Sequence, residues 1–198
     1  MTGSALVNVR GAGITQAGHV EGTVPVSVRD TVLFAARGRS LFALVIPPGQ
    51  PQSITVMRID GAATATRRQI SVNVPGFLQD VSSGPDGIYA GTAVIKRFTS
   101  SPDELLRIEP MTLTVLARAS FRSSVATVAA GRGLWASLGD GRVVRLDPRT
   151  LAVEASRRVL PAVLTASQAA TLSKPAFGRG SVWVMTGSGR HLDLLQLD

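Results

Sequence analysis

The sequence contains no cysteine among its 198 residues, which excludes disulfide bridges, thiolate nucleophiles and thiolate zinc sites. It has only two histidines, His19 and His191, in distant parts of the chain, so neither a histidine-rich metal centre nor a Ser/His/Asp site is indicated. No apolar run approaches the ~20 residues of a membrane span, and the first residues lack the basic start and apolar stretch of a signal peptide. We therefore expect no transmembrane segment and no signal peptide in the sequence as written, and the compartment stays open.

Lysine is scarce as well: the sequence has only Lys96 and Lys174. The net charge of +8 therefore comes almost wholly from arginine. A basic balance can mark a nucleic-acid or acidic-lipid partner. Here the arginines are scattered and lack the interleaved aromatic residues that stack on single-stranded bases. The composition therefore does not favour a nucleic-acid partner.

Aromatic residues make up only 5% of the chain, and long helical runs of Ala, Leu, Glu and Lys are missing. Glycine (20) and proline (11) are frequent, which favours many short strands joined by turns. At 44% hydrophobic content the chain can bury a core of its own. The expected class is all-β.

A repeat of 46 to 48 residues is the strongest signal in the chain. Each copy has a glycine-containing turn, an aliphatic residue, an aromatic residue and a short apolar strand. The aromatic residues of the four copies are Phe42, Tyr89, Trp135 and Trp183. This period predicts a β-propeller of about four blades, each of four antiparallel strands. Aromatic residues at a structural period are expected to pack between adjacent blades.

A second landmark inside each repeat is an apolar strand that ends in an acidic residue and a turn. It occurs at 56–64, 105–113 and 143–151, and as "LLQLD" at 194–198. The acidic residue and the proline after it suit a type I turn. In the third repeat the pattern predicts four strands, at Val125–Ala130, Leu134–Leu138, Arg142–Asp147 and Ala152–Arg158. The Gly139-Asp140-Gly141 segment between the second and third of these is a hairpin signal.

The segments "GPDGIYAG" and "GRGLWASLGDGRVVRLDPRTLAVEA" resemble blades of the YVTN, NHL-like and streptogramin-lyase-like group of bacterial β-propellers. The resemblance covers roughly residues 30 to 198 and implies the architecture, since these propellers include enzymes, binding modules and assembly platforms. Quinone-dependent propellers have a similar layout, but their tryptophan docking pattern is not evident after the Asp147 or Glu109 turns.

We expect one domain over residues 1–198. Its predicted parts are outer strands of a partial blade (1–30), three blades (31–76, 77–122 and 123–169) and a partial blade (170–198). Two alternatives remain open for the ring. Either the N-terminal strand closes a four-bladed ring, or the propeller is incomplete and is completed by further blades or by oligomerisation.

Long connections are predicted on one face of the propeller, at 46–53, 93–103, 159–175 and 187–191, and short turns on the other. Long loops on a rigid scaffold are where binding is usually found. The candidate binding residues on this face, which the sequence does not separate from ordinary solvated loop charges, are Lys96, Arg97, Asp103, Glu104, Lys174, Arg190 and His191. The arginine pairs Arg67-Arg68 and Arg157-Arg158 are expected on outermost strands, where charge blocks unwanted strand pairing.

The predicted function is therefore a non-catalytic propeller platform that binds a protein or small-molecule ligand through its long-loop face. No catalytic residue, metal ligand or cofactor is predicted. The alternative, which depends on the blade resemblance alone, is a metal-assisted lyase or hydrolase of the streptogramin-lyase-like group.

Overall fold

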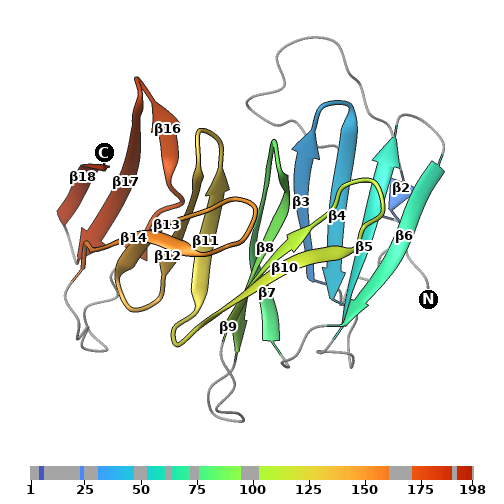
Figure 1. Ribbon diagram of the computed structural model, residues 1–198, viewed down its shortest axis with the longest axis horizontal. Helices are drawn as coiled ribbons and strands as arrows, with labels where there is room; N and C mark the ends of the chain where they lie inside the picture. Colours follow the sequence, from blue (N-terminus) through green and yellow to red (C-terminus); the bar gives the residue numbers. More distant parts are fainter. Residues whose placement is uncertain are drawn as a thin grey trace.

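A computed structural model describes residues 5–6, 23–24, 31–46, 53–60, 64–71, 76–94, 103–160, 171–188 and 191–197. Every regular element in these ranges is a β-strand, and all the strand pairs are antiparallel. The strands form four main sheets that follow one another along an arc (Figure 1). The predicted all-β class and the blade architecture are therefore confirmed.

Three sheets are complete four-stranded meanders, in which neighbours in the sheet are also neighbours in the sequence. Blade 1 contains β3 (Thr31–Arg37), β4 (Ser40–Ile46), β5 (Ser53–Asp60) and β6 (Thr64–Ser71). Blade 2 contains β7 (Gly76–Gly84), β8 (Gly87–Val94), β9 (Asp103–Ile108) and β10 (Val115–Phe121). Blade 3 contains β11 (Val125–Ala130), β12 (Leu134–Leu138), β13 (Arg142–Leu146) and β14 (Val153–Arg158). Strands A to D denote the four strands of a blade in this order.

Blade 4 has only three strand positions among the residues described. Two short strands, β15 (Thr171–Leu172) and β16 (Ala176–Gly178), both pair with β17 (Ser181–Ser188) and together form an interrupted strand A. Strand C is β18 (His191–Leu197), and no strand of the described segments pairs with its outer edge. The position of strand D is therefore not filled by any of them.

The N-terminal strands do not complete this blade. β1 (Ala5–Leu6) pairs with β2 (Thr23–Val24) in a sheet of their own. In Figure 1, β2 is seen at the same end of the arc as β6, opposite to β18. Among the described residues the propeller is incomplete, and the N-terminal residues 5–6 and 23–24 do not close it. The rest of the N-terminal part (1–30) lies outside the described residues, and the division into a single domain stays a prediction.

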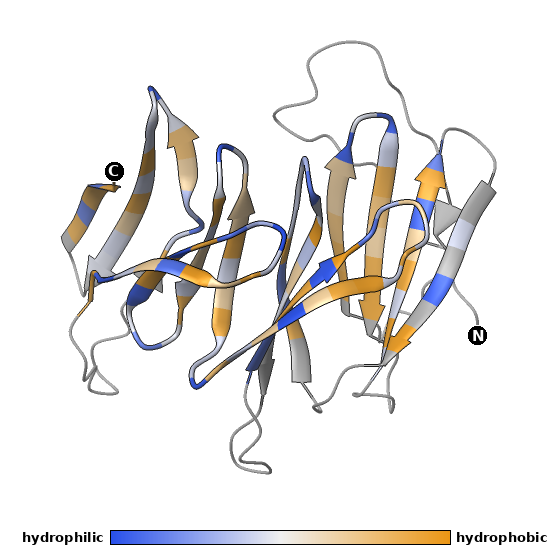
Figure 2. Ribbon diagram, viewed as in Figure 1, coloured by the Kyte–Doolittle hydropathy of each residue, from blue (hydrophilic) through white to orange (hydrophobic). Residues whose placement is uncertain are grey.

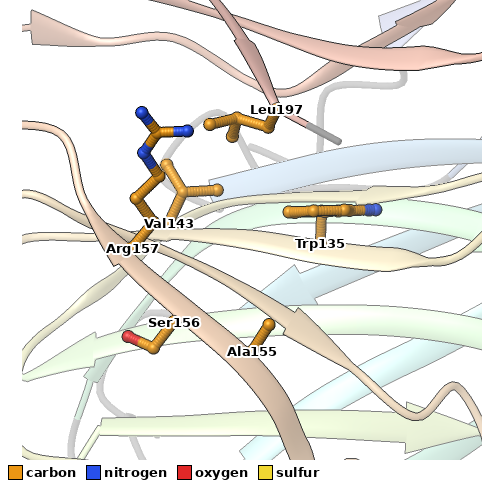
Figure 3. A pocket seen from close by; sticks show the side chains of 6 residues that line it. All are labelled: Trp135, Val143, Ala155, Ser156, Arg157 and Leu197. Atoms are coloured by element: carbon orange, nitrogen blue, oxygen red, sulfur yellow. The ribbon is translucent and has the colours of Figure 1, made fainter.

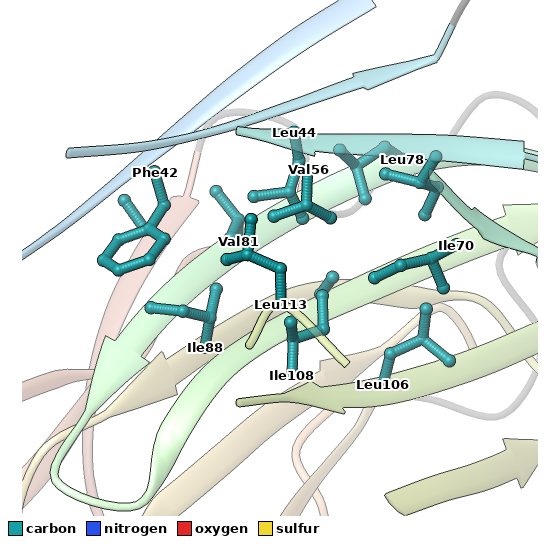
Figure 4. Packing of buried hydrophobic residues seen from close by; sticks show 13 residues of the cluster. Phe42, Leu44, Val56, Ile70, Leu78, Val81, Ile88, Leu106, Ile108 and Leu113 are labelled. Atoms are coloured by element: carbon teal, nitrogen blue, oxygen red, sulfur yellow. The ribbon is translucent and has the colours of Figure 1, made fainter. Parts of the chain in front are cut away.

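Packing between blades follows the repeated aromatic residue, as predicted. The buried cluster that contains Phe42 joins blade 1 to blade 2 (Figure 4). The cluster of Tyr89 joins blades 2 and 3, and that of Trp135 joins blades 3 and 4. The strands that supply these clusters are mostly hydrophobic, while the tips of the A–B hairpins are hydrophilic (Figure 2). Blades 1 to 3 thus each place their aromatic residue against the next blade along the chain, whereas Trp183 of blade 4 belongs to none of these clusters and donates to the Gly178 carbonyl of its own blade.

Local turn chemistry explains where the strands end. In blade 3 the four strands differ from the predicted bounds by one residue at most, and Gly141 in the B–C hairpin has φ = 83°, which glycine adopts without strain. After strand C, the carboxylate of Asp147 accepts hydrogen bonds from the backbone N–H groups of Arg149 and Thr150, at 2.9 and 2.7 Å. Glu109 holds the equivalent turn in blade 2 in the same way.

Candidate functional site

The structure separates the predicted binding residues into three groups. Asp103 and Glu104 are the first two residues of β9 and are only 0% and 2% exposed. Lys174 lies between β15 and β16 and is exposed. His191 begins β18, but its side chain is outside the description. The remaining candidates, which lie outside the described residues, are Lys96, Arg97 and Arg190.

The start of β9 is held by interactions inside blade 2. The backbone N–H of Glu104 donates to Oγ1 of Thr92 at 3.0 Å, and that hydroxyl donates to the Glu104 carbonyl at 3.1 Å. The Glu104 carboxylate lies 3.4 Å from Nη1 of Arg118 on the neighbouring outer strand. Because Asp103 and Glu104 are buried, a ligand on the surface does not touch them in this conformation, and their binding role stays a prediction.

Lys174 is engaged in a long-range contact between blades 2 and 4. Its Nζ lies 2.9 Å from Oδ2 of Asp80 in β7 and donates to the Val81 carbonyl at 2.9 Å. The same carboxylate oxygen of Asp80 accepts the backbone N–H of Val128 in β11, at 2.8 Å. One carboxylate thus connects three blades, and sequence reasoning did not single it out.

A polar pattern in β7 extends this connection along the inner strands. Ser82, two residues after Asp80 and therefore on the same face of the strand, accepts the backbone N–H of Ala130 at 3.0 Å. Ser83 donates to the carbonyl of Ala36 in β3. The side chains of β7 therefore satisfy backbone groups of both neighbouring inner strands. The signal in the sequence is the polar run "QDVSSG" inside an otherwise apolar repeat.

A cavity of about 200 Å³ lies between blades 3 and 4 (Figure 3). The residues that line it are Trp135, Val143, Ala155, Ser156, Arg157 and Leu197. All six residues of β14 are exposed, whereas the equivalent strand β10 alternates between exposed and less exposed residues because blade 3 covers one of its faces. The cavity therefore lies where none of the described strands forms an outer strand of blade 4 that would cover β14.

A second cavity, of about 180 Å³, lies on the short-turn side between blades 2 and 3. The hydroxyl of Tyr89 donates to the carbonyl of Pro148 at 2.9 Å, and burial raises the pKa of Tyr89 to about 12. Next to it, Asp86 in an A–B turn pairs with Arg149 in a C–D turn at 3.1 Å. The A–B and C–D turns are therefore on the same side of the blades, as predicted. The neutral phenol of Tyr89 has a structural role, because it links blade 2 to the C–D turn of blade 3.

The far face of blade 4, which is the face that points away from blade 3, carries exposed apolar side chains. Met185, Leu192 and Leu194 share this face and are 45%, 71% and 65% exposed. By strand register, the residues equivalent to Leu194 in blades 1 to 3 are 0%, 0% and 1% exposed; they are Val56, Leu105 and Val143. The exposed apolar face is thus the surface that the other blades bury against their successors.

Within the described ranges, no three His, Asp or Glu side chains are placed to hold a metal ion. In that part of the chain there is also no helix long and apolar enough to cross a membrane.

The stacked four-stranded blades define the protein as a member of the β-propeller fold class, present as an incomplete ring. No protein-family model and no curated protein matches the chain. Among solved structures it is similar to BamB from Moraxella catarrhalis, with a TM-score of 0.57 and 15% identity over 86% of this chain. It is also similar to apo AztD from Citrobacter koseri, with a TM-score of 0.53 and 12% identity over 77% of this chain.

Both of these structures are β-propellers, and at such low identity the likeness shows the fold alone. The chain covers 48% of the BamB chain and 39% of the AztD chain, so it spans about half the length of the propellers it matches, or less. The narrower resemblance to the YVTN and streptogramin-lyase-like group stays a prediction.

Proposed function

We propose that this chain is a non-catalytic propeller scaffold that binds an acidic or polar segment of a protein partner through its long-loop face. The observation that carries the proposal is the contact of Lys174 with Asp80. This ionisable pair between the inner strands joins blades 2, 3 and 4 and is not arranged as an acid–base or metal centre. The inner strands therefore supply rigidity, and recognition is left to the loops.

Charge supports an acidic partner. The net charge is +8, and the cationic residues that the sequence predicts for the long-loop face are Lys96, Arg97 and Arg190, in addition to Lys174, which is paired with Asp80. Positive charge around a binding face raises the rate and strength of association with acidic segments, and this effect weakens as salt screens the charge.

An acidic probe tests the proposal directly. We expect an octaglutamate peptide to bind the purified chain at low salt, measured by calorimetry, and the triple variant Lys96→Ser, Arg97→Ser, Arg190→Ser to weaken that binding at least tenfold. The matched control removes the same charge from exposed A–B turns on the opposite side, through Arg39→Ser, Arg132→Ser and Arg179→Ser. This control is expected to keep most of the affinity.

Equal losses in both triple variants would mean that binding follows net charge alone and would overturn the assignment to the long-loop face. The same preparation should be analysed for bound metal. A stoichiometric divalent metal ion in the purified protein would favour the alternative, a metal-assisted lyase or hydrolase, over a non-catalytic scaffold.

A further inference from the structure

Two leucines with an unusual backbone conformation follow the C–D turns. Leu113 and Leu151 have φ = 55° and 64°, in the left-handed region that a leucine rarely adopts. Each donates its backbone N–H to the carbonyl of the turn's acidic residue, Glu109 or Asp147, at 2.9 Å. Both side chains are buried, at 0% and 2% exposure. The turns therefore hold each leucine in a fixed, inward position.

Each leucine fills the space between its own blade and the preceding one. Leu113 belongs to the cluster that joins blades 1 and 2, where Figure 4 shows it among Val81, Ile88 and Ile108. Leu151 belongs to the cluster that joins blades 2 and 3. A leucine of the same turn thus fills the same position at two successive junctions.

The walls of that position are equivalent at all three junctions. The preceding blade supplies two walls, and strand register gives the equivalent residues at junctions 1–2, 2–3 and 3–4. The aromatic residue is Phe42, Tyr89 and Trp135 in turn, and the residue of strand C is Val56, Leu105 and Val143 in turn. The strand C residue of the following blade is Ile108, Leu146 or Leu197. At the junction of blades 3 and 4, these walls are Trp135, Val143 and Leu197, which line the cavity of about 200 Å³ (Figure 3).

We infer that this cavity is a binding site for a leucine side chain carried by an extended segment of a partner protein, which adds as a fourth strand to the outer edge of β18. Strand addition supplies main-chain hydrogen bonds, and a pocket for one side chain supplies specificity. The exposed residues of β14 form the other wall of the same slot. Arg157 at the cavity favours an acidic residue near the leucine.

The described strands of the chain itself do not fill the slot, because β2 lies at the opposite end of the arc (Figure 1). The site is also separate from the long-loop residues of the proposed function, since none of those lines the cavity. The leucine site and the long-loop binding face can therefore be tested independently, and the failure of one does not contradict the other.

The chain supplies its own probe, a peptide of residues 147–158, which contains the turn, Leu151 and a complete strand D. In a Trp183→Phe background, Trp135 is the remaining tryptophan and lines the cavity, so its fluorescence reports binding. We expect saturable binding with a blue shift, and about tenfold or greater weakening when the peptide carries Leu151→Asp, because a buried leucine contributes on that order.

A blocking variant locates the site. Ala155→Arg places a long side chain in the cavity from an exposed position of β14 and is expected to abolish the fluorescence change. Ala152→Arg adds the same side chain at an exposed position outside the cavity and is expected to leave binding unchanged. Equal binding of the Leu151→Asp peptide, or unchanged binding to the Ala155→Arg chain, would overturn the inference.

A peptide of residues 19–28, taken from the N-terminal part (1–30) that is predicted to supply outer strands, distinguishes an alternative occupant. If it binds the cavity and the peptide of residues 147–158 does not, the slot belongs to this chain's own N-terminal segment and the partner assignment fails. Dimers seen by light scattering that dissociate when the 147–158 peptide is added would instead assign the slot to a second copy, and would also overturn the partner assignment.

Discussion

The single tyrosine of the chain shows how one side chain holds two blades together. Tyr89 is 1% exposed, and its ring packs between blades 2 and 3 while its hydroxyl donates to the Pro148 carbonyl. Burial disfavours the charged phenolate, which raises the pKa of Tyr89 from 10.0 to about 12.

This pKa shift predicts a delayed titration. Because the folded pKa lies above the unfolded one, the contribution of Tyr89 to stability is complete below pH 10 and is lost as pH rises toward 12. Tyrosinate absorbance of the native chain should rise near pH 12, and that of the urea-unfolded chain near pH 10. With only one tyrosine in the sequence, a native transition near pH 10 would contradict the burial.

A second residue predicts a pH dependence at the acidic end. Hydrogen bonds from the Thr150 backbone and hydroxyl, and from the Arg149 backbone, hold the pKa of Asp147 below its ordinary value of 3.8. Its stabilising contribution is therefore present above pH 3.8 and is lost as pH falls through the lower, folded pKa.

We expect Asp147→Asn to lower the urea midpoint at pH 7 and the difference from the unchanged chain to narrow as pH falls below 3.8. The control is Asp193→Asn, which alters an exposed carboxylate of β18 and should change the midpoint little at either pH. A difference that stays constant down to low pH would show that Asp147 does not act through its charge.

The C–D turn has the same hydrogen bonds in blades 2 and 3, and its leucines are predicted to stabilise the junctions. Replacing a buried leucine by alanine removes apolar contacts and leaves a cavity, at a cost of about 3 kcal/mol. We expect this loss in the free energy of unfolding for Leu113→Ala and for Leu151→Ala, measured by urea denaturation. Met111→Ala, in the same turn but 68% exposed, should cost less than about 0.5 kcal/mol.

The sequence predicts the strands well and the turns only in part. The period-two pattern and the acidic residue with proline define β13 and β14 to within a residue, because both signals are local. The left-handed conformation of Leu151 was missed, although "TL" after the turn recurs in two repeats, since what stabilises it is the cluster contributed by another blade. A short local window does not contain that information.

The candidate site shows the same limit. Asp103 and Glu104 were predicted on a loop face because charge usually marks exposed segments. The structure begins β9 at these two residues and buries them, with Thr92 and Arg118 as partners of Glu104. Asp80 was passed over because its partners, Val128 and Lys174, are distant in sequence.

At the scale of the whole molecule, the blades differ in how they are covered. β12 is buried at all five positions, with a blade on either side, whereas β18 carries Leu192 and Leu194 on an open face. In repeat architectures, units with fewer covered faces open at lower free energy.

Amide hydrogen exchange should reflect this difference. We expect the amides of Leu134–Leu138 to exchange slowest and those of His191–Leu197 to exchange among the fastest strand amides, measured by mass spectrometry on proteolytic fragments. Equal protection of the two strands would indicate that the far face of blade 4 is covered in solution.

The link between Asp80 and Lys174 has a consequence for how the arc folds. In a simple repeat protein, a unit interacts only with its neighbours, so disorder at one end stops at the next blade. Here a bond between residues 94 positions apart skips blade 3 and makes blade 4 depend on blade 2. Closing such a long chain loop is entropically costly, so this bond forms late in folding, after blades 2 and 3 are in place. Once formed, it couples blade 4 to blade 2 in addition to the packing of blade 4 on blade 3, so opening β7 removes the partner of Lys174 and weakens the attachment of blade 4.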